Sequence, residues 1–141
     1  MGLKEKYGSV ALVAGASEGI GAAFSEFYAK AGLDLVLIAR RKEPLVAFAN
    51  GLSKKYNIEV QCIACDLSLP EASDLILNEL NGKMINIFTY NAALSFIGPF
   101  ESNSLADHEK LTQVNVTTPK KLVHHFGKSM LNNKKGAVVL M

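Results

Sequence analysis

The stretch Val10-Ala-Leu-Val-Ala14-Gly15-Ala16-Ser17-Glu18-Gly19-Ile20-Gly21 decides the fold that this sequence encodes. An apolar run of strand length breaks into three glycines, and the chain continues with apolar residues at helical spacing. We expect these residues on one face of a helix: Ile20, Phe24, Phe27, Tyr28 and Ala31. Glycine lets the backbone turn sharply and approach a ligand, while a helix start presents unpaired N–H groups and a partial positive charge. Strand, glycine turn and helix in this order predict a phosphate-binding turn.

Composition and charge exclude several other classes of protein. The 141 residues are 49% hydrophobic and 20% charged, which is typical of one globular domain with its own core. The net charge is +2 and no basic run exceeds a Lys-Lys pair, so we expect no nucleic-acid partner. No apolar stretch is long enough to span a bilayer and no signal peptide is visible. We therefore expect a cytoplasmic protein without membrane contact.

The cysteines and histidines do not suggest a metal or redox site. Cys62 and Cys65 lie three residues apart in a stretch that reads as a strand, with Cα atoms about 10 Å apart and side chains on opposite faces. They lack a second pair of zinc ligands, so we expect two buried, inert thiols in a reducing compartment. His124 and His125 are adjacent and do not share a helix face, and with His108 they are expected to be ordinary helix residues.

Strand and helix patterns alternate from residue 8 onward. We expect strands over residues 8–14, 34–39, 58–65, 85–90 and 137–141. Helices are expected over residues 19–31, 43–56, 70–80 and 104–131, and Ser68 is expected to cap the helix over 70–80. Near-continuous apolar strands separated by helices indicate a parallel sheet covered on both faces. The sequence therefore predicts one α/β domain over residues 1–141, a doubly wound parallel sheet that ends with its fifth strand.

The polar and glycine residues that stand out all follow the carboxyl ends of expected strands. The glycine turn follows the first strand, Arg40-Arg41 the second, Asp66 the third and Asn91 the fourth. Ligands of doubly wound sheets bind at this edge. An acidic residue after the second strand would select NAD, whereas a guanidinium can bind a 2′-phosphate in bidentate fashion, so Arg40-Arg41 favour NADP. The alternative is that both arginines are solvated residues in front of a helix.

These motifs resemble those of the short-chain dehydrogenase/reductase family, in the same order and at similar spacing. The resemblance covers essentially the whole chain and rests on Gly15-x-x-x-Gly19-Ile20-Gly21, Arg40, Asp66-Leu67, Asn91-Ala92 and Asn115. The ending Ala39-Arg40-Arg41 of the second strand is most similar to NADP-dependent reductases of the family. The resemblance implies a Rossmann-like fold that binds NADP(H). It also implies hydride transfer between the nicotinamide and a small-molecule carbonyl or alcohol substrate.

The same resemblance implies roles for individual residues. Ser17 and the backbone of the turn, which includes Gly15, Glu18, Gly19, Ile20 and Gly21, would hold the pyrophosphate and the adenosine phosphate. Asp66 would bind the adenine amino group, with the Leu67 backbone beside it. Asn91 and Ala92 would steady the fourth strand and the adenosine ribose. Asn115, in Gln113-Val-Asn-Val116, matches the asparagine that holds a water in the family's proton relay.

The sequence departs from the family pattern at three places. Ala93 stands where the family has a glycine beside the cofactor, and its tolerance depends on φ at that residue. Ala14 replaces the usual threonine and loses one side-chain hydrogen bond. The family's serine after the fifth strand and its Tyr-x-x-x-Lys motif do not occur before Met141. We therefore expect the amino-terminal, cofactor-binding part of a longer enzyme, inactive on its own.

Two other functions stay open, and self-association is a further expectation. A naturally short protein could bind or sense a nucleotide without catalysis, and a flavodoxin-like module is disfavoured because the glycine turn has dinucleotide spacing. The strand over 137–141 would leave an unpaired edge, which favours a homo-oligomer. The helix over 104–131 carries apolar residues beyond one narrow stripe, so we expect that covering the sheet does not bury all of them. These are Leu111, Val114, Leu122, Val123, Phe126, Met130 and Leu131.

Overall fold

Five parallel strands form one sheet in the computed structural model, which describes residues 1–141. The strands are β1 (Val10–Ala14), β2 (Asp34–Ala39), β3 (Val60–Ala64), β4 (Ile87–Tyr90) and β5 (Ala137–Leu140). Their order across the sheet is β3-β2-β1-β4-β5, and every neighbouring pair is parallel. The chain winds from β1 to one edge and then returns to the other side of β1. This topology confirms the predicted doubly wound α/β fold.

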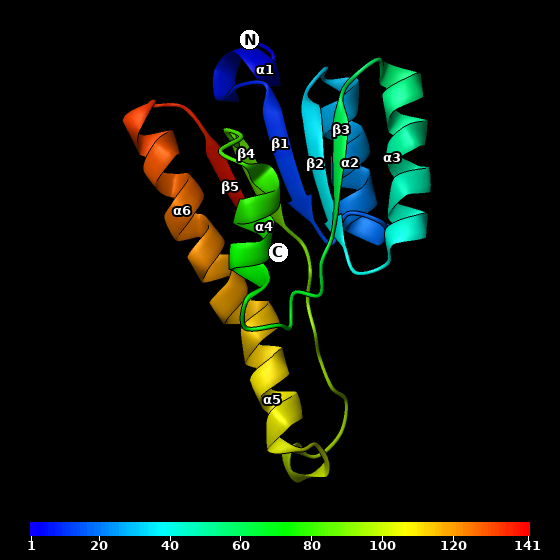
Figure 1. Cartoon of the computed structure of the whole chain (residues 1–141), viewed down its shortest axis with the longest axis vertical. Coiled ribbons are helices and arrows are strands. Elements are labelled where there is room, and N and C mark those ends of the chain that lie inside the picture. Colours follow the sequence, from blue (N-terminus) through cyan, green and yellow to red (C-terminus); the bar gives the residue numbers. More distant parts are fainter.

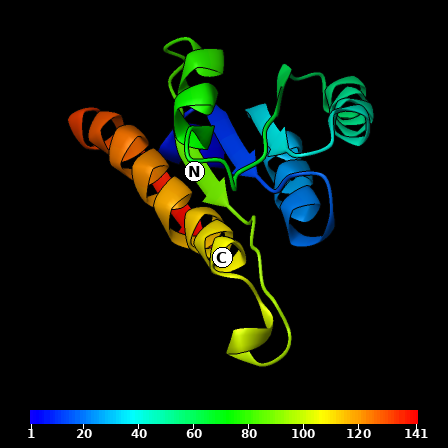
Figure 2. The same cartoon turned by 60° about the horizontal axis from the view of Figure 1, so that its bottom comes forward.

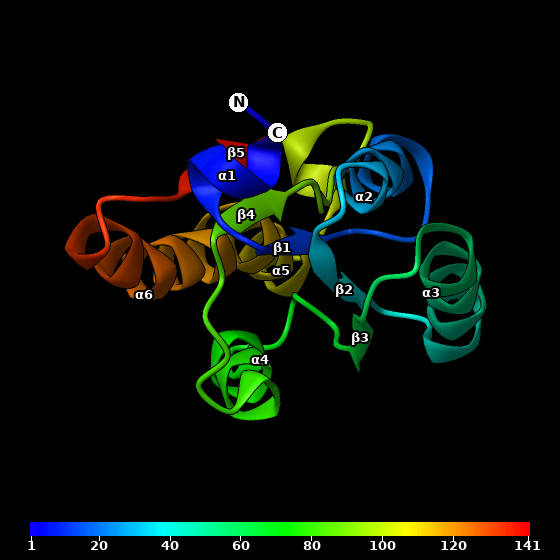
Figure 3. The same ribbon diagram turned by 90° about the horizontal axis from the view of Figure 1, so that it is seen from above.

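Helices cover both faces of this sheet. The α-helices of the chain are α1 (Leu3–Tyr7), α2 (Gly19–Lys30), α3 (Lys42–Tyr56), α4 (Ala72–Leu80), α5 (Leu105–Thr112) and α6 (Thr118–Asn132). Seen from above, α2 and α3 lie on one face, and α4 and α6 lie on the other (Figure 3). Each face buries its own core, with 17 buried residues under α4 and α6 and 13 under α2 and α3. Burial on both faces explains the unbroken apolar runs of the strands.

The carboxyl ends of the strands form the functional edge of the sheet. β1 lies between β2 and β4, so the winding direction reverses beside β1 and leaves a crevice at this edge. The long segment after β4, which contains the 3-10 turn η1 (Phe100–Ser102), extends beyond the sheet together with α5 (Figures 1 and 2). This segment and α5 therefore build a wall that the sheet itself does not supply.

The chain before β1 forms a helix that the sequence pattern did not indicate. α1 has only five residues, too few for a periodic pattern, and its Leu3 and Tyr7 pack against the core under α2 and α3. The Asn86 side-chain oxygen accepts from the backbone N–H groups of Ser9 at 3.0 Å and Val10 at 3.1 Å. These bonds fix the entry to the sheet, so β1 begins two residues later than predicted.

The helix predicted over residues 104–131 consists of three segments. α5 ends at Thr112, a π-helical turn η2 covers Gln113–Thr117, and α6 follows. Pro119 stands in the first turn of α6 and has no N–H to donate back along the helix. The Val114 carbonyl, five residues earlier, accepts instead from Tyr90 Oη at 2.6 Å. The helical run from Leu105 to Asn132 is therefore continuous, as predicted, but the prediction did not include the π-helical turn in its middle.

The predicted cap of α4 was wrong. α4 begins at Ala72 after Glu71, which makes no side-chain capping bond. Ser68 Oγ donates to Asp66 Oδ1 at 2.8 Å instead, so this serine serves the loop after β3 rather than the helix.

The apolar face predicted for α2 packs on the core only in part: Phe24 and Tyr28 contact it, and other predicted residues do not. Gly21, Ser25, Tyr28 and Ala29 are buried, whereas Ile20 and Phe27 each remain 56% exposed. Small residues let the helix approach the sheet closely, and Ser25 Oγ donates to the Gly21 carbonyl at 2.8 Å, which satisfies the buried hydroxyl. A search for large apolar residues alone therefore missed the small buried residues Gly21, Ser25 and Ala29.

The apolar residues of the composite helix formed by α5, η2 and α6 are not all buried, as predicted. Phe126 packs edge-on against Phe88 of β4, with ring centroids 5.2 Å apart. Among the predicted set, Leu131 alone is exposed, at 79%, while the others are buried or half-buried: Leu111, Val114, Leu122, Val123, Phe126 and Met130. The sheet and α4 thus bury most of the apolar side chains of this helix.

The two cysteines lie on opposite faces of the sheet, as predicted, and both are free thiols. Cys65 belongs to the core under α4 and α6, and the half-buried Cys62 packs against the core on the other face. Burial raises the pKa of both thiols, and the carboxylates of Asp66 and Glu71 raise that of Cys65 further. None of the helices is both long and apolar enough to cross a bilayer.

Candidate functional site

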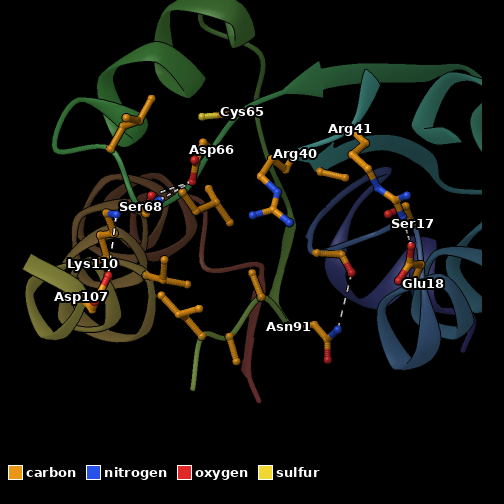
Figure 4. Close-up of a pocket in the computed structure, with 18 of the residues that line it drawn as sticks. Ser17, Glu18, Arg40, Arg41, Cys65, Asp66, Ser68, Asn91, Asp107 and Lys110 are labelled. Atoms are coloured by element: carbon orange, nitrogen blue, oxygen red, sulfur yellow. Dashed lines mark hydrogen bonds and ion pairs between the residues drawn. The ribbon is translucent and has the colours of Figure 1, made fainter. Parts of the chain in front are cut away.

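A cleft of about 760 Å³ opens at the carboxyl edge of the sheet. The loops after β1, β2, β3 and β4 border it, and α5 forms its far wall (Figure 4). Ten of the predicted site residues line it: Gly15, Ser17, Glu18, Arg40, Arg41, Asp66, Leu67, Asn91, Ala92 and Ala93. Gly19, Ile20, Gly21 and Asn115 lie outside the lining. Segments far apart in the sequence meet here because the ends of parallel strands share one edge.

The glycine turn between β1 and α2 packs too tightly for side chains at two positions. Gly15 has a φ of +77°, and a Cβ there would lie 2.8 Å from the Ala92 nitrogen. A Cβ on Gly21 would lie only 1.8 Å from the Gly15 carbonyl oxygen. The first turn of α2 therefore rests directly on the Gly15 peptide, and that peptide rests on the segment after β4.

Gly19 differs from these two glycines because it faces open space. Its φ is +54°, and a Cβ built on it would meet no atom within 4 Å. It is the first residue of α2, where backbone N–H groups have no acceptor inside the helix. Ile20 follows it on the outer surface. An uncrowded glycine at a helix start leaves room for a phosphate to approach the backbone, so the turn fits a pyrophosphate group.

The loop after β1 is tied to the end of β2, and its Glu18 carboxylate lies next to the arginine pair that follows β2. The backbone amides of residues 15 and 16 donate to the Ile38 carbonyl at 2.9 and 3.1 Å. Arg41 Nη2 donates to Glu18 Oε1 in an exposed ion pair. Arg40 has no carboxylate partner and its guanidinium points into the cleft (Figure 4). Of the two arginines predicted to bind the cofactor, Arg40 has no ionic partner and Arg41 is paired with Glu18.

Asp66 is fixed as a carboxylate by its neighbour Ser68. The Ser68 backbone N–H and hydroxyl donate to Asp66 Oδ1 at 2.9 and 2.8 Å. These two bonds, and to a smaller degree the charges of Arg40 and Lys110, hold the pKa of Asp66 below its ordinary value. The other carboxylate oxygen has no partner in the chain and is free to accept a hydrogen bond in the cleft.

The Leu67 carbonyl is anchored from the opposite side. The hydroxyl of Thr118, which is fully buried, donates to it at 3.0 Å and accepts from Gln113 Nε2 at 3.0 Å. The loop after β3 is therefore tied to the junction between η2 and α6.

The segment after β4 continues the sheet for one residue and then turns outward. Asn91 N donates to the Ala14 carbonyl at 2.9 Å, and Asn91 Nδ2 reaches the Gly15 carbonyl at 3.5 Å. Ala93 is not among the residues with positive φ, so a methyl group there causes no backbone strain. The departure from glycine at this position is accommodated without cost to the turn.

Asn115 lies in the π-helical turn and binds the backbone of Leu94 with both ends of its amide. Nδ2 donates to the Leu94 carbonyl at 2.7 Å, and Oδ1 accepts from the Leu94 N–H at 2.9 Å. Together with the bond from Tyr90 to Val114, this clamp fixes η2 to the segment after β4. π-Helical turns recur at functional sites, where they redirect a helix locally.

The sequence prediction missed the wall that α5 and the segment after β4 provide. Its residues include Leu94, Phe96, Asp107, Lys110 and Val114, in addition to Ser68 from the loop after β3. A signal was present: Ser104 and Asp107 form a capping box that starts α5, and Lys110 and Val114 follow Asp107 on the same helix face.

The two buried tyrosines near the site serve packing rather than proton transfer. Tyr90 Oη donates to the Val114 carbonyl, and Tyr28 Oη is hydrogen-bonded to Thr89 Oγ1 at 2.8 Å. Burial raises the pKa of both phenols. A general acid for neutral pH needs a pKa nearer 7, so neither group suits that role. The chain also holds no cluster of three or more side chains able to bind a metal ion.

The sheet order, the glycine turn and the cleft beside β1 define a Rossmann-type nucleotide-binding protein. The sequence places it further: the model of the short chain dehydrogenase family matches residues 9–141. The chain belongs to this family.

Known relatives agree with this placement over nearly the whole chain. The 7beta-hydroxysteroid dehydrogenase of Mediterraneibacter gnavus is 34% identical over 139 residues, which are 99% of this chain and 53% of the relative. A solved 7beta-hydroxysteroid dehydrogenase superposes with a TM-score of 0.95 at 33% identity, covering 99% of this chain and 54% of that one. A short-chain dehydrogenase from Sphingobium yanoikuyae in complex with NADPH gives 0.87 at 31% identity, over 94% of this chain and 52% of that one. The chain thus spans about half the length of these relatives.

Proposed function

We propose that residues 1–141 form one domain that binds NADP(H) for a short-chain oxidoreductase acting on a small-molecule carbonyl or alcohol. The observation that carries this proposal is the meeting of the glycine turn, Arg40, Asp66 and Asn91 around one cleft in a chain of this family. The 7beta-hydroxysteroid dehydrogenases and the NADPH complex among its relatives support both the reaction type and the cofactor.

Each wall of the cleft suits one part of the dinucleotide. The turn from Gly15 to Gly21, with Ser17, offers backbone N–H groups and a hydroxyl to the pyrophosphate. Arg40 offers a free guanidinium to the 2′-phosphate, with Arg41 next to it. The free oxygen of Asp66 can accept from the adenine amino group beside Leu67. When bound, the nicotinamide supplies or accepts the hydride.

The remaining proposed contacts come from the segment after β4 and from η2. Asn91, Ala92 and Ala93 line the cleft where the ribose would lie. Asn115 holds Leu94 through its side chain, so its effect on any proton relay would pass through the position of η2. The role of Asn115 in holding a water stays a prediction.

Titration with both dinucleotides tests the cofactor proposal. We expect the 141-residue chain to bind NADPH more tightly than NADH, and Arg40→Asp to erase or reverse that preference. Lys128→Asp is the matched control, because Lys128 is an exposed residue of α6 outside the cleft and the change in net charge is the same. Equal affinities of the wild-type chain for the two dinucleotides would contradict the preference, and binding of neither would contradict the site.

The 141 residues should not catalyse hydride transfer alone. The family's Tyr-x-x-x-Lys pair does not occur in these residues, because no tyrosine has a lysine four residues later. The tyrosines are Tyr7, Tyr28, Tyr56 and Tyr90. We expect no NADPH oxidation with a ketone substrate by protein of this intact mass. Measurable turnover would favour another source of the proton. NADPH binding without turnover is what the cofactor-binding part of a longer enzyme predicts, and also what a short nucleotide-binding module would give.

Self-association and a reducing location complete the proposal. β5 stands at an edge of the sheet, and Val138, Leu140 and Met141 expose apolar side chains there. An unpaired apolar edge favours pairing with another copy of the chain. The free thiols of Cys62 and Cys65 are consistent with the cytoplasm, where thiols stay reduced.

A further inference from the structure

We propose that Glu18 limits the preference of this site for NADP by competing with the 2′-phosphate for Arg41. The inference rests on the proposed function, because it concerns the same cleft. It adds a specificity-determining residue: the carboxylate and Arg41 together set how strongly NADP is favoured over NAD.

The geometry places the competitor inside the cleft. Ser17, Glu18, Arg40 and Arg41 line the same end of it, where the loops after β1 and β2 meet. The bonds from residues 15 and 16 to Ile38 tie the start of the loop after β1 to the end of β2, so this loop lies beside the loop that carries Arg40 and Arg41. Figure 4 shows Arg41 turned toward Glu18, while Arg40 points to the middle of the cleft.

The charges explain the effect on selectivity. Arg40 and Arg41 carry two positive charges and Glu18 carries one negative charge, so the ion pair leaves one uncompensated cation for a ligand. A phosphate monoester carries about −1.5 to −2 charges at pH 7. To bind it with both guanidiniums, Arg41 must leave Glu18, and the freed carboxylate then stands close to the phosphate.

The ribose of NAD, which has no 2′-phosphate, is not repelled by the Glu18 carboxylate. Its 2′-hydroxyl is neutral and can donate to a carboxylate, which is how acidic residues favour NAD in dinucleotide-binding folds. Glu18 can therefore tolerate NADH and oppose NADPH. Both members of the pair are largely exposed, at 62% for Arg41 and 73% for Glu18, so the pair is weak enough for a phosphate to displace.

Affinity measurements on the full 141-residue chain test the inference. We expect Glu18→Gln to raise the ratio of NADPH to NADH affinity by about three- to tenfold at low salt, and the gain should shrink as ionic strength rises. Glu26→Gln is the matched control. Glu26 lies in α2, the helix that Glu18 directly precedes; it pairs with Lys55 at 2.7 Å and carries the same charge, but it is outside the cleft. Its removal should leave the ratio unchanged.

A double-mutant cycle separates competition for Arg41 from simple repulsion. If Glu18 competes for Arg41, the gain from Glu18→Gln should be smaller in an Arg41→Gln background than in the wild type. An equal gain in both backgrounds would overturn competition, and no gain over Glu26→Gln would overturn the role of Glu18 altogether. In these two cases the dinucleotide still binds and the proposed function stands. Binding of neither NADPH nor NADH to the wild-type chain would overturn both.

Discussion

Asn115 and Leu94 join two walls of the cleft through a single side chain. Both hydrogen bonds of the Asn115 amide go to the backbone of Leu94, at 2.7 and 2.9 Å. Asn115 belongs to the π-helical turn, and Leu94 to the segment that leaves β4. The position of that segment, which β4 alone does not determine, therefore depends on one asparagine.

Asn115→Ala should loosen this segment without unfolding the domain. Two hydrogen bonds at an exposed position are lost, so we expect the free energy of unfolding to fall by about 1–2 kcal/mol. Urea unfolding measures the loss, and amide hydrogen exchange should show faster exchange at Leu94. Asn50→Ala is the control, since Asn50 is an exposed residue of α3 without a side-chain hydrogen bond. Unchanged exchange at Leu94 would contradict the role of the clamp.

Gly21→Ala should damage the glycine turn far more than another glycine-to-alanine change in a helix. The added Cβ would lie 1.8 Å from the Gly15 carbonyl oxygen, so backbone must move. We expect a loss of more than about 2 kcal/mol in thermal or urea unfolding, together with loss of dinucleotide binding.

Gly51→Ala provides the comparison for this prediction. Gly51 lies inside α3, and a Cβ there meets no atom within 4 Å. Alanine should stabilise the helix by about 0.5–1 kcal/mol. Equal effects of the two substitutions would show that the turn can relax around a methyl group.

The sequence was sufficient to predict the sheet because the strands are buried on both faces. Continuous apolar runs such as Leu35–Val36–Leu37–Ile38 are typical of parallel strands buried on both faces, and glycine or polar residues end each run. α1 and the π-helical turn could not be predicted in the same way. One is shorter than a helical period requires, and the other depends on tertiary bonds from Tyr90 and Asn115.

The candidate site was predictable where it depends on strand ends and less so where it depends on helix α5. The parallel register of β1, β2 and β4 places Gly15, Arg40 and Asn91 at the carboxyl edge of the sheet, independently of the conformation of the loops. Lys110 enters the cleft only because α5 begins at a particular residue beyond the end of the sheet. The pairing of Arg41 with Glu18 likewise follows from loop geometry, which composition does not reveal.

Asp66 should link stability to acid pH through Ser68. Its pKa is lowered in the folded state, so its contribution is present above the unfolded value of about 3.9 and is lost as pH falls through the lower folded value. Ser68→Ala removes one of the two donors and should raise the pKa of Asp66, which carboxyl-carbon NMR measures. The variant should then lose less stability than the wild type between pH 6 and pH 3.

Ser53→Ala is the control for this prediction. Ser53 Oγ donates to the Ile58 carbonyl at 2.7 Å and touches no carboxylate. Its removal should lower stability by a similar amount at both pH values. An unchanged pKa of Asp66 in Ser68→Ala would show that the backbone N–H alone lowers it.

The two thiols should differ in reactivity. Cys65 is buried and has a pKa raised by burial and by two carboxylates, whereas the half-buried Cys62 is affected by burial alone. A higher pKa leaves less thiolate, which is the reactive form. In the native chain at neutral pH we expect iodoacetamide to modify Cys62 before Cys65, and both more slowly than in urea. Faster modification of Cys65, read by peptide mass spectrometry, would contradict this order.

The free edge of β5 should support pairing with a second copy of the chain. The amides of Ala137 and Met141 donate inward to the segment around β4, so the alternate residues Val138 and Leu140 direct their backbone groups to the open edge. Apolar burial contributes about 25 cal/mol per Å², so a few hundred Å² at this edge would give several kcal/mol before association costs. We expect a dimer at micromolar concentration by light scattering.

Leu140→Lys should shift this equilibrium toward the monomer, because a charge on an edge strand opposes strand addition. Phe27→Lys is the matched control. Phe27 is exposed to a similar degree, 56% against 59% for Leu140, but lies on α2 away from the edge. If Phe27→Lys dissociates the dimer and Leu140→Lys does not, the contact lies on the exposed stripe of α2. A wild-type chain that scatters only as a monomer would mean that the edge stays unpaired in solution.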